Sequence, residues 1–434
     1  MKKVLIITYY WPPSGGGGVQ RWLKFVKYLR NFDWEPVIYT PENPEGPAED
    51  QSLFKDIPKN IEVIKRPIKE PYRFYKKLTG KSKDQKIQTA FLSESESKSS
   101  FLENLSIWIR GNFFIPDARK SWIKPSVNYL SSYLQKSDID VIVTTGPPHS
   151  MHMIGYYLKK KLNISWLADF RDPWTNIDYY DQLKLTKRAD RIHQKLEKEV
   201  LSKADAVTVV SPGMIDDFKS KVDREYFFIP NGYDEDDINT GVKTKKSEKF
   251  TLSHIGSLTK TRNPENLWRV LKELISKDEQ FSKDLEIRNI GKIDFNVVES
   301  LRKIGLEKYV TTISYLPHDQ VIDEQKKSSL LLLLINDTPN AKLILTGKLF
   351  EYLASGTPVI CIGPIDGDAA SVLQNTECGY VFDFNNEKHL KKQIQSAYEI
   401  FKKGELTSKC INVDQFERKE LTKKMAEVLN QIME

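Results

Sequence analysis

One segment of the chain combines a lysine, a glutamate and a glycine-bounded helix in a pattern that suits a phosphate ligand. Residues 343–360 (LILTGKLFEYLASGTPVI) are expected to form a loop, a short helix, a Gly-Thr-Pro turn and a buried strand. A helix N-terminus at the carboxyl edge of a parallel sheet carries partial positive charge. Lys348 would add a full charge beside it.

The glutamate of this segment indicates what else the ligand carries. The Glu351 carboxylate could accept hydrogen bonds from two neighbouring hydroxyls. A ligand with both a phosphate and a vicinal diol is a nucleotide or a nucleotide-sugar. The alternative is a structural helix on which Glu351 is merely solvated. Gly347 and the Gly-Thr-Pro turn bracket the helix at both ends and favour the site.

A glycine-rich loop lies between a predicted strand and a predicted helix near the start of the chain. Its four glycines are Gly15, Gly16, Gly17 and Gly18. A ligand could approach their backbone amides closely, which suits a diphosphate or a sugar. A dinucleotide fingerprint would need glycine where the chain has Gln20, although Glu42 lies where a ribose-binding acid is expected. An NAD-dependent oxidoreductase is therefore one alternative, and a merely flexible loop is another.

Histidine and carboxylate side chains follow two further strands of the first half. His149 lies in a loop, and Ser150 could cap the helix that follows. Asp169 and Asp172 flank an arginine at the end of the next strand, where burying unpaired carboxylates would be costly. They form either an internal ion-pair network or part of a site. We favour a site that positions an acceptor hydroxyl or stabilises charge in the transition state.

The first strand-to-helix turn of the second half carries a third candidate. It contains Gly256 and, six residues later, Arg262, which could hold a phosphate through two hydrogen bonds. The alternative is a surface arginine.

Apolar runs of strand length alternate with helical patterns along the whole chain, and this alternation predicts parallel sheets covered by helices. The expected strands are 4–8, 36–39, 140–145, 165–168, 206–210, 250–254, 285–290, 310–314, 330–335, 358–362 and 379–382. A Pro-Asn-Gly turn marks a junction near 229–233. We expect an α/β protein of two Rossmann-like doubly wound domains, 1–228 and 229–412, facing a central cleft, followed by an amphipathic helix in 413–434.

Composition bounds the class of protein. The 434 residues carry a net charge of +7 without a dense basic tract, so we expect no nucleic-acid partner. The longest apolar run is of strand length, which favours a cytoplasmic protein or one peripheral to the inner membrane face. The three cysteines are widely spaced, so we expect neither a zinc site nor a disulfide, and a reducing compartment.

Residues 65–125 fit neither half. Residues 65–86 are basic, residues 93–100 are typical of a mobile loop, and residues 108–122 interleave aromatic side chains with Arg and Lys. The last segment could contact a membrane surface or a lipid-linked acceptor. The alternative is a packed arm whose charged side chains reach water.

Together these segments resemble a GT-B fold glycosyltransferase of the family-4 kind (glycosyl transferases group 1). The resemblance covers nearly the whole chain and lies in residues 12–18, 169–174, 231–234 and 348–360. It implies a nucleotide-sugar donor, commonly linked to UDP or GDP, bound mainly by the second domain. It also implies a glycan or lipid-linked acceptor, retention of anomeric configuration, a role in cell-surface polysaccharide synthesis and a C-terminal helix that crosses back to the first domain. A non-catalytic glycan-binding or scaffold subunit of the same fold is an alternative.

The chain departs from the family pattern at three places. Glu351 matches the second glutamate of the Glu-x7-Glu motif, but Leu343 stands in place of the first; Ser257 replaces the arginine after Gly256; and the first domain's strand-end histidine is absent. The resemblance implies donor contacts from Gly15, Gly16, Gly17, Gly18, Gly256, Arg262, Thr346, Gly347, Lys348, Leu349 and Glu351.

Catalysis is then expected to be electrostatic, with Arg262 and Lys348 stabilising the departing diphosphate. His149, Asp169 and Asp172 would act on the acceptor. We expect no metal and no cofactor, since the nucleotide-sugar is a substrate.

Overall fold

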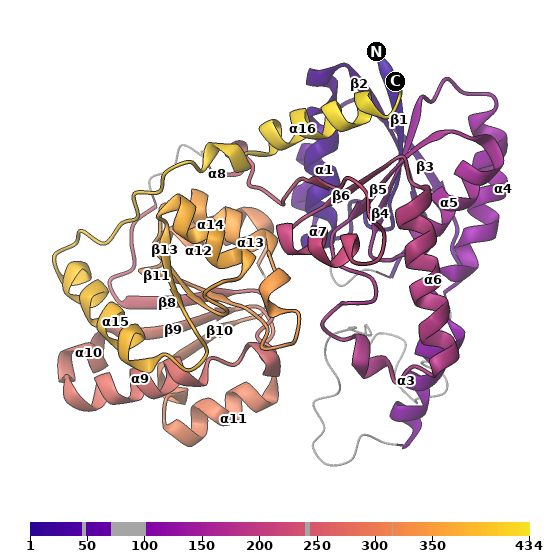
Figure 1. Ribbon diagram of the computed structural model, residues 1–434. Helices are drawn as coiled ribbons and strands as arrows, with labels where there is room; N and C mark the ends of the chain where they lie inside the picture. Colours follow the sequence, from indigo (N-terminus) through magenta and orange to yellow (C-terminus); the bar gives the residue numbers. More distant parts are fainter. Residues whose placement is uncertain (46–48, 71–100, 239–243, 315) are drawn as a thin grey trace. The chain divides into compact units, whose positions relative to one another are not determined.

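Two parallel sheets, each covered by helices on both faces, make up the protein (Figure 1). The computed structural model describes residues 1–45, 49–70, 101–238, 244–314 and 316–434. The chain folds as two compact units. Unit 1 contains the described residues up to Pro230 together with Arg418–Glu434, and unit 2 contains Asn231–Glu417 apart from the residues outside the described ranges.

The sheet of unit 1 has seven strands in the order β3-β2-β1-β4-β5-β6-β7. They are β1 (Lys2–Ile7), β2 (Trp34–Pro41), β3 (Glu62–Arg66), β4 (Val141–Gly146), β5 (Ser165–Phe170), β6 (Ala206–Val209) and β7 (Phe227–Phe228). The inner strands are buried on both faces, as their nearly continuous apolar sequences require.

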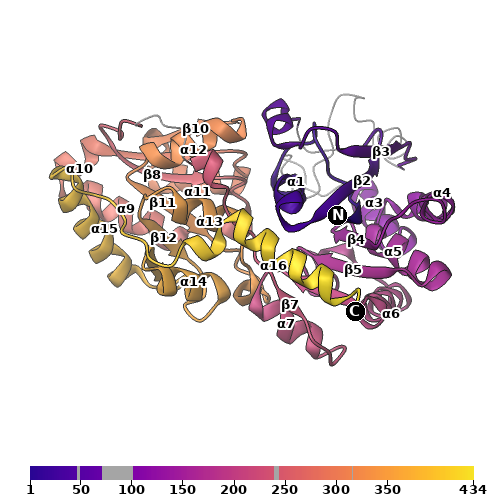
Figure 2. The ribbon, with the colours of Figure 1, turned by 90° about the horizontal axis from the view of Figure 1, so that it is seen from above.

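The helices of unit 1 form one layer on each face of the sheet. One face is covered by α4 (Ile123–Leu134), α5 (Ser150–Leu162), α6 (Lys187–Lys203) and α7 (Pro212–Lys219). The other is covered by α1 (Gly17–Leu29) and α16 (Arg418–Gln431). A further helix, α3 (Phe101–Phe113), precedes α4. Because α16 packs on α1, the C-terminal helix returns to the first unit (Figure 2), as the family resemblance implied.

The sheet of unit 2 has six strands in the order β10-β9-β8-β11-β12-β13. They are β8 (Phe250–Ile255), β9 (Leu285–Ile290), β10 (Val310–Ile313), β11 (Leu330–Leu334), β12 (Val359–Ile362) and β13 (Gly379–Phe382). One face packs on α9 (Glu265–Lys277), α10 (Glu279–Asp284), α11 (Phe295–Ile304) and α15 (Glu387–Lys402). The other packs on α12 (His318–Lys327), α13 (Gly347–Ala354) and α14 (Asp368–Thr376); the short helix α8 is Glu235–Ile238.

Every strand expected from the sequence is present, and the prediction of two Rossmann-like doubly wound domains is confirmed. Two strands were missed. β3 is a partly exposed strand that includes Lys65 and Arg66, which the sequence placed in an irregular arm, and β7 has only two residues. Neither has the buried apolar run that marks the other strands. Residues 71–100, which include the predicted mobile loop 93–100, lie outside the described residues.

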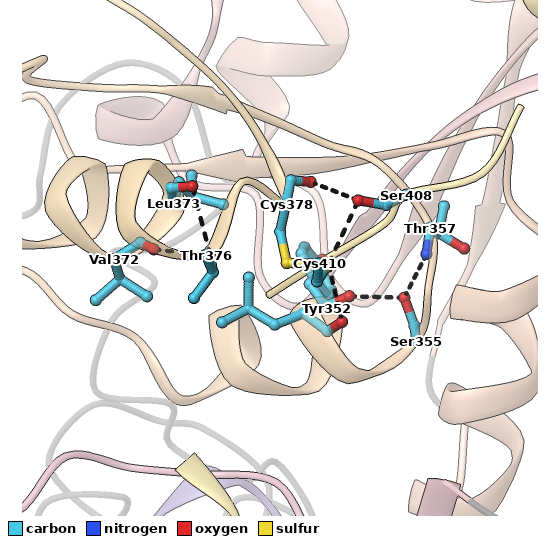
Figure 3. Close-up of a disulfide and its surroundings, with 10 residues drawn as sticks. Tyr352, Ser355, Thr357, Val372, Leu373, Thr376, Cys378, Ser408 and Cys410 are labelled. Carbon is cyan, nitrogen blue, oxygen red and sulfur yellow. Dashed lines mark hydrogen bonds between the residues drawn. A yellow bond between two sulfur atoms is a disulfide. The ribbon is translucent and has the colours of Figure 1, made fainter. Parts of the chain in front are cut away.

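The expectation of no disulfide is wrong, because Cys378 and Cys410 are bonded (Figure 3). Cys378 precedes β13, and Cys410 lies on the segment that follows α15; the two are 32 residues apart in sequence, with Cα atoms 4.7 Å apart. A hydrogen bond also holds that segment beside Cys378, since the Ser408 hydroxyl donates to the Cys378 carbonyl oxygen at 3.3 Å. Sequence spacing could not show a pairing that depends on the return of a segment to the edge of the sheet. Cys361 is unpaired and buried.

Candidate functional site

Helix α13 and the loop after β8 are fixed to each other at the carboxyl edge of the unit 2 sheet. The hydroxyl of Tyr352, a fully buried side chain of α13, accepts a hydrogen bond of 3.1 Å from the backbone amide of Ile255 at the end of β8. Gly256 follows with φ of 115°, a conformation that strongly favours glycine. A Cβ atom on Gly256 would lie 2.7 Å from Lys348 Nζ, so the lysine ammonium sits directly beside this glycine.

Lys348 is a cation without a partner among the residues that the structure describes. Its Nζ forms neither a hydrogen bond nor an ion pair there. The side chain is half-buried; removal from water lowers its pKa to about 7, the nearby Arg262 charge acts in the same direction, and Glu351 opposes both. Withdrawing an unpaired ammonium from water is unfavourable unless an anion binds to it. Lys348 is therefore suited to receive a phosphate.

Arg262 lies near Lys348 and is held in place by the protein. Its Nε donates to Asn336 Oδ1, and its Nη1 donates to the Ser257 carbonyl oxygen at 3.3 Å. The guanidinium also borders a cavity of about 790 Å³ whose walls come mainly from α9, α11 and the loop ends of the sheet. Lys348 and Glu351 do not line this cavity. Arg262 thus borders the cavity and acts electrostatically on Lys348.

The N-terminal turn of α13 is open. Thr346, the residue before the helix, does not cap it with its hydroxyl. Nothing crowds Gly347, because an added Cβ would make only ordinary van der Waals contact with Asn231, at 3.7 Å. Leu349 was also expected to contact the donor. Its side chain is fully buried, so only its backbone could do so. The helix amides and Lys348 together form a positive region suited to an anion.

Glu351 lies one turn beyond Lys348 and on the same side of α13. Its carboxylate is partly exposed, and Oε2 accepts a hydrogen bond of 3.1 Å from Gln325 Nε2 on α12. Unit 2 therefore brings together Gly256, Arg262, Thr346, Gly347, Lys348 and Glu351.

The glycine loop of unit 1 leads into α1, whose first residue is Gly17. Gly16 has φ of 90° and is exposed, so backbone amides are accessible there. Arg171 connects this loop to another one: Nη1 donates to the Gly18 carbonyl oxygen at 3.1 Å, and Nη2 donates to the Pro147 carbonyl oxygen. An added Cβ on Gly18 would lie 3.0 Å from this Nη1 and 3.0 Å from the Tyr10 ring, so both side chains would have to shift slightly.

His149 is packed inside unit 1. Its ring stacks on that of Trp174 with centroids 4.5 Å apart, and only 7% of the residue is exposed. Burial lowers the pKa of His149 well below its usual range, so the imidazole is neutral at neutral pH. The prediction that Ser150 caps α5 is wrong: Ser150 is the first helical residue, and its hydroxyl and amide both donate to Asp117 at 2.8 Å.

Asp169 and Asp172 have different environments. Asp169 is fully buried and accepts hydrogen bonds from Arg21, Trp22, Thr145 and Thr208. Burial raises its pKa, but the Arg21 charge and these hydrogen bonds more than offset the effect, so the pKa lies below its ordinary value and the carboxylate stays ionised. Asp172 is exposed. The geometry favours an internal ion pair for Asp169 and leaves Asp172 open to an acceptor.

Sequence reasoning missed three residues that position the candidate site. They are Arg171, Gln325 and Tyr352. Arg171 was noted only as the neighbour of two carboxylates. Gln325 belongs to a helix whose sequence gives no sign of contact with α13, and Tyr352 reads as an ordinary core residue. No cluster of metal-binding side chains occurs among the described residues, and no helix in that part of the chain is long and apolar enough to span a membrane.

Comparison with known proteins identifies the class. Residues 235–412 match the model of glycosyl transferases group 1, and residues 83–237 match that of Glycosyltransferase Family 4. The chain therefore belongs to the family-4-like glycosyltransferases of GT-B fold. No curated protein sequence matches it significantly.

Solved structures of the same fold cover nearly the whole chain. Sucrose-phosphate synthase from Thermosynechococcus elongatus is 14% identical with a TM-score of 0.63, over 100% of this chain and 99% of that one. TarM from S. aureus, in complex with UDP and alpha-GlcNAc-glycerol, is 13% identical with a TM-score of 0.61, over 99% and 100%. WaaG, a glycosyltransferase involved in lipopolysaccharide biosynthesis, is 14% identical with a TM-score of 0.55, over 98% and 99%.

Proposed function

We propose that this glycosyltransferase transfers a hexosyl group from a UDP- or GDP-linked donor to a glycan or lipid-linked acceptor, with retention of configuration. The observation that carries the proposal is the unpartnered Lys348 ammonium beside Gly256 at the open N-terminus of α13, one turn before Glu351. These groups suit the diphosphate and the ribose of one nucleotide. The UDP bound to TarM, a protein of the same fold, supports this donor class.

The proposed chemistry is electrostatic and independent of metal ions or cofactors. Lys348, Arg262 and the first amides of α13 stabilise negative charge on the departing nucleoside diphosphate while the sugar becomes oxocarbenium-like. The acceptor hydroxyl attacks the same face of the sugar that the diphosphate leaves. Asp172, an exposed carboxylate of unit 1, positions that hydroxyl, and neutral His149, stacked on Trp174, adds no charge there. The glycine loop, tied to Pro147 by Arg171, offers backbone amides to the donor.

Nucleotide binding tests the donor site. UDP, GDP and their sugars are screened by thermal shift against the wild type and against Lys348→Ala, Arg262→Ala and Glu351→Ala. A ligand at a hundredfold excess over its dissociation constant adds about 2.7 kcal/mol of stability. We expect a shift with UDP or GDP compounds that all three variants reduce. The controls Lys342→Ala and Arg269→Ala remove exposed cations of unit 2 and should keep the shift. A shift with NAD alone would overturn the proposal.

A non-catalytic GT-B subunit is the second candidate, because Leu343 stands in place of the first glutamate of the family motif. Such a protein would bind the donor without hydrolysing or transferring the sugar. Release of UDP or GDP from the sugar nucleotide, measured with and without acceptor extracts, separates the two candidates. Turnover that disappears in Glu351→Ala together with donor binding supports the enzyme. Donor binding without any turnover supports the subunit.

Contact with a membrane surface from the cytoplasmic side, in cell-surface polysaccharide synthesis, is a further part of the proposal. Leu105, Trp108, Ile109 and Phe113 are exposed at helical spacing on α3. Such a face can insert into the headgroup region, with nearby cations on anionic lipids. We expect binding to vesicles of phosphatidylcholine and phosphatidylglycerol that the double variant Trp108→Ser, Phe113→Ser loses. The control Tyr157→Ser changes an exposed aromatic residue on α5 and should bind normally.

A further inference from the structure

Gln325 is a fully buried polar side chain beside the proposed ribose-binding glutamate. It lies on α12, and its Nε2 is 3.1 Å from Glu351 Oε2. Because a carboxylate has no hydrogen to donate, the amide nitrogen and not the amide oxygen must face it. The Gln325 backbone is fixed as well, since its carbonyl oxygen accepts a hydrogen bond of 3.0 Å from the buried Thr357 hydroxyl. Gln325 is thus a rigid donor aimed at Glu351.

This arrangement is unfavourable for stability in one respect. Gln325 Oε1 is buried and has no hydrogen-bond partner within the described part of the chain. A buried carbonyl oxygen left unpaired loses its interaction with water and gains nothing in return. An apolar side chain of similar size would avoid that loss. What the glutamine provides in its place is the hydrogen bond to Glu351.

The neighbours of Glu351 show what that hydrogen bond prevents. Lys348 lies one turn earlier on the same side of α13, where oppositely charged side chains commonly pair, and Glu351 already acts on the pKa of Lys348. A Glu351 side chain free to rotate could pair with the ammonium. In such a pair Lys348 could no longer bind the phosphate, and Glu351 could no longer accept hydrogen bonds from the ribose. Holding Oε2 on Gln325 keeps the two charged groups apart.

We infer that Gln325 is a positioning residue that holds the Glu351 carboxylate in the orientation that accepts the ribose hydroxyls of the donor. This inference rests on the proposed function, because it concerns the same donor site. With Oε2 occupied by Gln325, Oε1 is left to the diol. The side chain acts through Glu351 and does not touch the nucleotide.

Nucleotide affinity separates positioning from a merely structural role. Binding of UDP and GDP, and of their 2′,3′-dideoxy analogues, is measured by calorimetry for the wild type, Gln325→Leu, Glu351→Gln and the double variant. We expect Gln325→Leu to bind the ribonucleotides about tenfold more weakly and the dideoxy analogues nearly as the wild type does. The double variant should bind no more weakly than Glu351→Gln, since both changes remove one interaction. Gln320→Leu, an exposed position on the same helix, is the matched control.

Unfolding midpoints of the same variants give a second readout. Gln325→Leu removes the unpaired amide oxygen, so its midpoint should equal or exceed that of the wild type while ribonucleotide affinity falls. A packing role alone would lower stability and change the affinity for both kinds of nucleotide equally.

A charged variant adds a pH signature. Gln325→Glu places two carboxylates within hydrogen-bond distance, and such pairs share a proton because one pKa rises strongly. At a pH above the raised pKa both are ionised and repel, so ribonucleotide affinity relative to the wild type should be low. At pH 6 the Glu side chain at position 325 is protonated and donates to Glu351 as the glutamine does. The ribonucleotide affinity of the variant should then approach that of the wild type.

The outcomes distinguish this inference from the proposed function. A wild type that binds ribonucleotides and dideoxy analogues equally overturns the proposed donor site and the positioning role with it. A wild type that prefers ribose, together with a Glu351→Gln variant that loses this preference, upholds the donor site. If Gln325→Leu then keeps the preference and Gln325→Glu shows no pH-dependent recovery, the positioning role alone is overturned.

Discussion

Arg21 and Asp169 form an ion pair inside unit 1, with 2.8 Å between Arg21 Nη2 and Asp169 Oδ1 and side chains that are 1% and 0% exposed. Arg21 Nη1 also donates to the Pro230 carbonyl oxygen at 2.9 Å, where the chain leaves unit 1. The pair therefore joins α1, the end of β5 and the last residue before the chain passes into unit 2. Its position argues for a role in holding the fold, since no acceptor could reach Asp169 without displacing these contacts.

Asp169→Ala should consequently destabilise the protein. Removing one partner of a buried ion pair leaves the other charge uncompensated and typically costs about 3–5 kcal/mol. Asp172→Ala, at an exposed carboxylate in the same loop, should change stability by about 0.5 kcal/mol or less. Urea unfolding of both variants tests the prediction. An Asp169→Ala protein of normal stability that lacks transferase activity would show instead that Asp169 acts on the substrate.

These two aspartates also show where the sequence stops being informative. Apolar runs marked every inner strand, because a strand buried on both faces needs apolar residues throughout. Helix α13 was found because Gly347, Lys348 and Glu351 are close in sequence. Asp169 and Asp172 are the same residue type three positions apart, and only the fold decides that one is buried on Arg21 and the other is exposed. Gln325 reaches Glu351 from 26 positions away, a contact that no local spacing encodes.

Gly256→Ala should weaken nucleotide binding beyond its effect on stability. The residue has φ of 115°, where a side chain is strained by about 1–3 kcal/mol. The new Cβ would also lie only 2.7 Å from Lys348 Nζ, so the ammonium would have to move away. Gly404→Ala is the matched control, because Gly404 has φ of 75° and nothing lies within 4 Å of an added Cβ. Both variants should unfold more easily in urea. Equal loss of UDP or GDP affinity in the two would mean that Lys348 is not the phosphate cation.

Nucleotide affinity should fall as the pH rises above 7. The Lys348 pKa of about 7 means that the ammonium is charged below this pH and increasingly neutral above it. A bound diphosphate favours the charged form and raises that pKa, so binding above pH 7 takes up a proton and affinity falls by up to about tenfold per pH unit. The phosphates contribute little there, since a terminal phosphate has a second pKa of about 6.

Calorimetry in buffers of different ionisation enthalpy measures this proton uptake directly. At pH 8 the wild type should take up nearly one proton on binding UDP or GDP, and Lys348→Met should bind weakly with almost none. Lys342→Met, at a lysine paired with Asp366 on the surface, should behave as the wild type. An affinity for the wild type that does not change between pH 7 and pH 9 contradicts the assignment.

Reduction should destabilise unit 2 through the bond between Cys378 and Cys410. A disulfide that closes a loop of 32 residues restricts the unfolded chain and contributes typically about 2–4 kcal/mol. Dithiothreitol should lower the urea midpoint by a corresponding amount, and Cys378→Ala, Cys410→Ala should reproduce the reduced protein and show no further change with reductant. Cys361 serves as the control, because burial raises the pKa of its thiol to about 12 and Cys361→Ala leaves the disulfide intact. Thiol titration of the unfolded, unreduced protein should find one thiol per chain; three would show that the two cysteines are not bonded in solution.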